Sequence, residues 1–298
     1  MIAAVLGTLS FVFQNICCKE YGKRFPNTLH PQLTMIVVSM TLVTAIMAVL
    51  GGAQLLTPMG YLLTLAFGLF FVLTLATMTL AMNCGHMGVT LLIQNSSLII
   101  PTIFGMLVWG EKLTLVKGIG VVLILTLLAL SSGDTPPATD ERFNTPRARR
   151  RWIMLTLLAF IGDGALGIFQ GMMSRECASI SSVTFTFWTS LFSVIAAVLL
   201  ILFYRLRGVG ADYITPEKRG HFLLWSGGIG LGTAGGNTLS ILALVTVPGV
   251  VFFPLRQGSV VLLMWLAGVV LYKEKINRRG ILMLACGLAG LILLNLGV

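Results

Sequence analysis

The chain has 298 residues, of which 56% are hydrophobic and only 10% charged, and its mean hydropathy is +0.95. Soluble domains carry about 25% charged residues, so this composition excludes a soluble enzyme, a disordered tail and a disulfide scaffold. The net charge of +10 does not indicate a nucleic-acid partner, because the basic residues cluster in short segments between apolar runs and form no stripe with aromatic residues. A multi-pass membrane protein is the class that remains.

Ten apolar stretches are long enough to cross a membrane as helices, since about 20 residues span the ~30 Å hydrocarbon core. The sequence therefore predicts an all-α protein with ten transmembrane helices in the cell (plasma) membrane. In chain order the stretches cover residues 2–18, 31–52, 59–82, 86–109, 113–132, 152–174, 180–204, 220–246, 248–272 and 277–297.

A polar segment divides these stretches into five plus five. Residues 133–151 combine prolines with five arginines, which is typical of an exposed linker. The predicted domains are therefore a first five-helix unit over residues 1–132, the linker over 133–151, and a second five-helix unit over 152–298.

The two halves carry similar residues at similar spacing, which indicates an internal repeat. Each half has a Phe-Gln pair followed by a basic–acidic pair, and later a Gln seventeen residues before a Glu. The repeated positions are Phe13, Gln14, Lys19, Glu20, Gln94 and Glu111 in the first half and Phe169, Gln170, Arg175, Glu176, Gln257 and Glu274 in the second. Because each repeat has an odd number of helices, the second is expected to insert in the opposite orientation, as in transporters built from inverted repeats.

Each half also has an acidic turn between its fourth and fifth stretches, at residues 110–113 (GEKL) and 273–276 (KEKI). With this doubled turn, the five-plus-five pattern resembles the EamA-like branch of the drug/metabolite transporter superfamily over essentially the whole chain. The resemblance implies a transporter of small organic solutes whose central cavity is lined chiefly by helices 1, 3, 4, 6, 8 and 9. The small multidrug-resistance relatives carry an essential glutamate in helix 1, whereas this chain has no acid before Glu20.

Two charges lie deep within the stretches. Arg256 is eight residues into the ninth stretch, so it is expected to face the bundle interior. It could bind an anion, because a guanidinium pairs bidentately with carboxylate or phosphate. The alternative is a structural ion pair with Asp163, the acid furthest inside any stretch. Asp163 is in turn a candidate counter-ion, ligand for a cationic solute or proton carrier.

Amide side chains form a second group of candidates. They can line a solute cavity as donors and acceptors, or they can link helices through hydrogen bonds, and both interpretations stay open. The candidate substrate-binding residues are Arg256, Gln257, Asp163, Gln14, Gln94, Asn95, Gln170 and Asn237.

Glu111 and Glu274 lie at predicted helix ends beside lysines. They could form ion pairs with nearby bases such as Lys112, Lys117 or Arg278, or they could latch the two repeats together as gating residues. The segment 230–235 fits the dinucleotide motif GxGxxG, but it lies inside an apolar stretch with no acid about 20 positions later. Close helix packing through small residues, or room for a solute beside the eighth helix, explains it better. No cofactor or metal site is expected.

These features predict a secondary transporter that moves a small organic solute across the lipid bilayer by alternating access. The alternatives are an intramembrane enzyme and a lipid-handling, scramblase-like protein. A monomer and a homodimer are both compatible with the sequence. Sixteen bases lie in the segments at one set of helix ends and three at the other, which places both termini outside by the positive-inside rule, whereas members of the resembled family usually have both inside.

Overall fold

The computed structural model describes residues 2–26, 28–84, 90, 93–131, 146–177, 180–207, 218–272 and 278–295. Within these residues the secondary structure is entirely helical, with no strand, so the predicted all-α class is confirmed. The helices are α1 (Ile2–Gly22), α2 (Leu29–Val49), α3 (Pro58–Cys84), η1 (Ser96–Leu98), α5 (Ile99–Val108), α6 (Leu115–Ser131), α7 (Pro146–Glu176), α8 (Ser182–Leu206), α9 (Arg219–Leu244), α10 (Gly249–Tyr272) and α11 (Arg278–Asn295).

Six of the described helices are long and apolar enough to cross a membrane: α1, α2, α3, α7, α8 and α10. The expectation of ten spans is therefore met only in part. The apolar segments around α5, α6 and α11 have 10–17 residues, which is short for a ~30 Å core at 1.5 Å per residue. The remaining helix, α9, has 26 residues but contains many glycines and begins with charged and polar residues.

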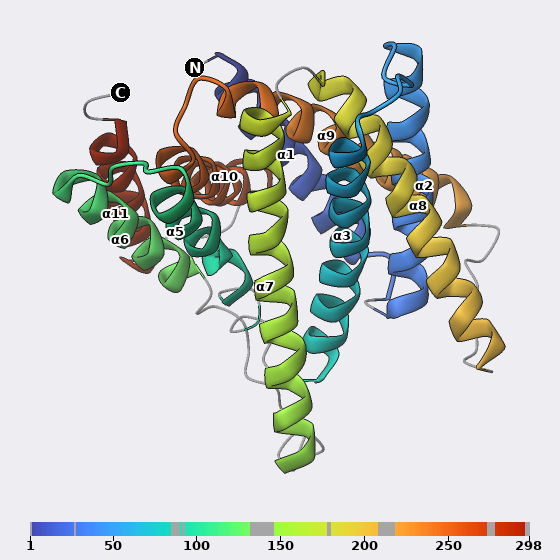
Figure 1. The fold of residues 1–298 in the computed structure, drawn as a ribbon. Helices are drawn as coiled ribbons and strands as arrows, with labels where there is room; N and C mark the ends of the chain where they lie inside the picture. Colours follow the sequence, from blue (N-terminus) through green and yellow to red (C-terminus); the bar gives the residue numbers. More distant parts are fainter. Residues whose placement is uncertain are drawn as a thin grey trace.

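Two element boundaries differ from the sequence prediction. The fourth stretch is not a regular α-helix throughout, because the 3-10 turn η1 immediately precedes α5. Helix α7 begins at Pro146, so residues 146–151 of the predicted linker are helical. Proline is favoured at the first position of a helix and arginine is a good helix former, which accounts for the earlier start. Figure 1 shows that α7 projects beyond its neighbours at one end.

Helices from the two halves of the chain pack against one another rather than forming separate bundles. Helix α1 lies along α9, α3 along α7, α2 along α8, and α6 along α11. Smaller contacts join α3 to α8, α2 to α9, α1 to α10 and α5 to α7. In Figure 1, α2, α3, α7 and α8 stand together, and α5, α6, α10 and α11 gather on the other side of α7.

Small residues allow the closest of these contacts. A Cβ atom at Gly232 would stand 2.7 Å from Gln14 Cβ, and one at Gly235 would stand 2.7 Å from Ser10 Oγ. Both glycines belong to the GxGxxG segment of α9 and face α1. The segment therefore serves close helix packing, which is one of the two interpretations that the sequence left open.

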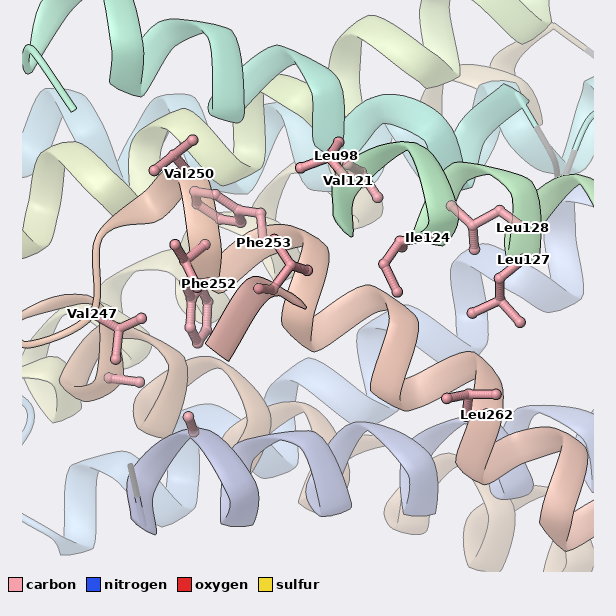
Figure 2. Close-up of a cluster of buried hydrophobic side chains, with 14 of the residues drawn as sticks. Leu98, Val121, Ile124, Leu127, Leu128, Val247, Val250, Phe252, Phe253 and Leu262 are labelled. Atoms are coloured by element: carbon pink, nitrogen blue, oxygen red, sulfur yellow. The ribbon is translucent and has the colours of Figure 1, made fainter. Parts of the chain in front are cut away.

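One apolar core lies where α6, α10 and α11 meet. Ile124, Leu127 and Leu128 on α6 are fully buried there. Figure 2 shows them toward one end of the core, with Phe252 and Phe253 of α10 toward the other. This core fixes α10 in place, and α10 carries Arg256.

Candidate functional site

Arg256 is partly buried, on the helical turn that follows Pro254 of α10. Its Nη1 donates a hydrogen bond to Gln170 Oε1 of α7 over 3.4 Å. Its guanidinium carbon lies over three phenyl rings, 5.1 Å from the centre of Phe11, 5.7 Å from Phe252 and 5.8 Å from Phe253. Cation–π contacts of this kind stabilise a charge that has left water. The site thus joins α1 of the first half to α7 and α10 of the second.

Gln170 extends this cluster to α9. Its side chain is 4% exposed, and its Nε2 donates to Asn237 Oδ1 over 3.2 Å. Arg256, Gln170 and Asn237 therefore form a continuous hydrogen-bonded row across three helices.

Asp163 is held by a different partner from the one that the sequence suggested. Ser97 of η1 donates its hydroxyl proton to Asp163 Oδ2, and among the described residues no ion pair within 4.0 Å joins Asp163 to Arg256. The two residues interact electrostatically over a longer distance. Asp163 lies seven residues before Gln170 on α7, about 10 Å along the helix axis, which accounts for the separation.

A second amide pair links α10 to the segment before η1. Gln257 Nε2 donates to Asn95 Oδ1 over 2.9 Å. The neighbouring Gln94 Oε1 is buried and has no hydrogen-bond partner within the described part of the chain. Within the described residues Gln14 forms no hydrogen bond with either amide pair, and it packs against Gly232 in the contact between α1 and α9.

Glu111 forms the other polar centre, at the start of α10. Its carboxylate accepts hydrogen bonds from the backbone N–H groups of Gly249, over 3.0 Å, and Val250, over 2.7 Å. It also pairs with Arg175 at the end of α7. Glu111 therefore pairs with Arg175 rather than with the lysines beside it in the sequence. Its side chain is 5% exposed, so it is more buried than a position at the water boundary suggests.

The backbone turn before Glu111 directs its side chain toward α10. Gly110 has a φ of 63°, in the left-handed region that favours glycine. The turn brings Glu111 back onto the end of α5, where its backbone N–H donates to Gly105 O. A Cβ at Gly105 would stand 2.8 Å from Glu111 Oε2, so the absence of a side chain there makes room for the carboxylate. Glu274, the predicted counterpart of Glu111, lies outside the described residues.

A cavity of about 530 Å³ adjoins this centre. Its walls come from the ends of α7 and α9 and from the connection to α10, and its lining residues are Trp109, Ser174, Arg175, Glu176, Leu244, Val245, Thr246, Val247 and Pro248. Arg175 also lies 4.8 Å from the centre of the Trp109 ring. The cavity therefore opens beside the Glu111–Arg175 pair and not at Arg256.

The sequence pattern did not predict a role for Ser97 or Phe11, nor the contact between Glu111 and Arg175. Ser97 and Phe11 carry no charge and do not differ by pattern from many other apolar-helix residues. Arg175 could have been identified from the sequence, because it occupies the repeat position of Lys19 and is one of the few bases at its set of helix ends. Within the described residues, no group of three or more His, Cys, Asp or Glu is placed to hold a metal ion.

Comparison with known proteins bears on the fold alone. No model of a protein family and no curated protein matches the sequence. One crystal structure of a protein is similar with a TM-score of 0.74, over 99% of this chain and 96% of the other, at 14% sequence identity. The fold, with its six long apolar helices, defines the class as a multi-pass, all-helical membrane protein.

Proposed function

We propose that the protein is a secondary transporter of a small organic solute in the cell membrane, built as two inverted five-helix repeats and related to the EamA-like drug/metabolite transporters. The proposal treats α1, α2, α3, η1–α5 and α6 as the first repeat. It treats α7, α8, α9, α10 and α11 as the second.

The observation that carries the proposal is the symmetry of the helix packing. Exchanging each helix of one repeat for its counterpart in the other turns the α1–α9 contact into the α7–α3 contact. The same exchange turns α2–α9 into α8–α3 and α1–α10 into α7–α5, and all of these contacts are present. Two repeats related by a two-fold axis in the membrane plane would produce this pattern.

The polar site lies where such a transporter would bind its solute. Arg256 and Gln170 come from the second repeat, whereas Phe11 comes from the first. Rocking one repeat against the other would therefore change access to the site from one side of the membrane to the other.

Glu111 supports a gate at one end of this path. Its carboxylate ties the end of the first repeat's fourth helix to α7 and to the first turn of α10. Opening that end requires the Glu111 carboxylate to break its contacts with α7 and with α10, while Arg256 stays within the bundle. The acid thus acts on the change between states and not on the solute.

Transport is tested with purified protein in liposomes, offered amino acids, nucleosides, sugars, organic cations and organic anions in turn. Saturable uptake of at least one class, absent from empty liposomes, is the expected result. Scrambling of a fluorescent lipid without solute uptake would favour the lipid-handling alternative and contradict the proposal.

A further inference from the structure

The Arg256 guanidinium has more hydrogen-bond donors than the protein around it uses. An arginine side chain carries five N–H groups, and within the described residues Arg256 donates one hydrogen bond, the long one of 3.4 Å to Gln170 Oε1. The rings of Phe11, Phe252 and Phe253 stabilise its charge. Phenyl rings offer no lone pair in the plane of the N–H groups, so the remaining donors are left for another acceptor.

The two amides that continue the row from Arg256 also leave a donor unused. Gln170 turns Oε1 toward the guanidinium, because its amide N–H₂ group would be repelled there. Its Nε2 then donates to Asn237 Oδ1. Asn237 takes part in the row through its oxygen, and its own N–H₂ group makes no hydrogen bond within the described residues. The unused donors of Arg256 and Asn237 therefore lie at the two ends of the row, with the Gln170 amide between them.

No carboxylate of the described residues lies within 4.0 Å of the guanidinium. Asp163, the acid deepest in the bundle, accepts its hydrogen bond from Ser97 instead. A base that is partly withdrawn from water and has no close counter-ion is unfavourable. An anion that entered the site would offset that cost, whereas a cation would add to it.

We propose that the solute carries an anionic group, carboxylate or phosphate, and that this group binds the free N–H groups of Arg256. This proposal rests on the proposed transport function. The planar guanidinium matches either oxyanion bidentately. Because Phe11, Phe252 and Phe253 form apolar surroundings, the rest of the solute is a small apolar or aromatic group.

The test compares four probes that share one apolar body. Purified protein is titrated calorimetrically with 3-phenylpropionate, 2-phenylethyl phosphate, 3-phenylpropionamide and 3-phenylpropylamine. We expect the carboxylate, the phosphate or both to bind, and the relative affinity of the two shows which oxyanion the site prefers. The neutral amide and the cationic amine do not bind. Arg256→Gln lowers the affinity for the bound anion about 30-fold or more, as when one partner of a buried charged hydrogen bond is lost.

Two further variants keep the result interpretable. Arg207→Gln removes one base at the exposed end of α8, so it makes the same change in net charge and leaves the affinity unaltered. If Arg256→Gln does not fold, Gln170→Glu replaces it. The new carboxylate would stand at the position whose oxygen already accepts from Arg256 Nη1, so it would occupy the guanidinium and also abolish anion binding. A melting curve for each variant establishes that it is folded.

Three results would overturn the anion site. The amine or the amide could bind as tightly as the acid, Arg256→Gln could bind with the same affinity as the wild type, or no probe could bind at millimolar concentration. Liposomes distinguish this failure from that of the transport function. Saturable uptake of a cation that is unaffected by Arg256→Gln leaves transport standing and overturns the anion site. Binding of the acid without uptake of any solute leaves the anion site standing and overturns transport.

Discussion

Arg256 and Asp163 are the two charges deepest in the bundle, and each is held by a neutral side chain rather than by the other. Arg256 donates to Gln170 and lies over phenyl rings, while Asp163 accepts from Ser97. Two charges that paired directly would satisfy each other and leave little for a solute. Their separation keeps hydrogen-bonding capacity within the bundle.

The bond between Ser97 and Asp163 makes a prediction about stability. Ser97→Ala removes a donor from a partly buried carboxylate, so we expect the free energy of unfolding to fall by about 1–3 kcal/mol. In an Asp163→Asn background the same change should cost less, because the neutral amide needs the hydroxyl less. Melting temperatures of the two single variants and the double variant measure the coupling. Strictly additive effects would contradict a direct interaction.

At the scale of single elements, two contacts fix how helices meet. The Glu111 carboxylate ties α10 to α7, and the glycines of α9 let α1 approach closely. The first contact is polar and can be broken and remade. The α1–α9 contact is close-packed, so it has no room for an added side-chain atom.

Glu111→Gln is expected to change the transport rate while leaving solute affinity nearly intact. The neutral amide loses its ion pair with Arg175 and its favourable charge at the start of α10, together about 1–2 kcal/mol. That energy shifts the balance between closed and open states roughly five- to thirtyfold. Turnover and equilibrium binding, measured on the same preparation, test the expectation.

Glu176→Gln is the matched control for this variant, since Glu176 is an exposed acid at the same end of α7 and takes no part in the Glu111 contacts. Its turnover should remain that of the wild type. A large loss of equilibrium binding in Glu111→Gln would show that Glu111 contacts the solute, and would remove its role as a gate.

Gly232→Ala should destabilise the protein by about 1–3 kcal/mol, because the new methyl group would stand 2.7 Å from Gln14 Cβ and 2.8 Å from the α1 backbone. Gly227→Ala, on the same helix, should be neutral or slightly stabilising, since its nearest neighbour would be Leu42 Cδ2 at 3.7 Å. Melting temperatures of the two variants compare them directly. Equal melting temperatures would contradict the close α1–α9 contact.

For the whole molecule, the distribution of bases predicts which way the protein faces. Sixteen bases at one set of helix ends and three at the other favour the first set in the cytoplasm. Figure 1 places the start of α1 and the end of α11 toward the same side of the bundle. A reporter fused after Val298 should therefore be active outside the cell. Activity inside would assign the orientation usual for the resembled family instead.

The amino-acid sequence alone specifies the class of fold and a short list of polar residues. An apolar fraction of 56% allows no water-facing domain, and stretches near 20 apolar residues specify helices, because a membrane leaves few other ways to satisfy the backbone. A charge or an amide is conspicuous in such a stretch. Arg256, Asp163 and Gln170 are therefore identifiable from hydropathy and residue type.

Which of these residues meet depends on tertiary packing. Asp163 is a plausible partner for Arg256 by its depth in the sequence pattern, yet a separation of seven residues from Gln170 along α7 puts it nearer to Ser97. Glu111 is expected beside lysines, yet the turn at Gly110 directs it to Arg175 and the start of α10. Hydropathy specifies that a side chain faces inward, but the packing of whole helices determines what it contacts there.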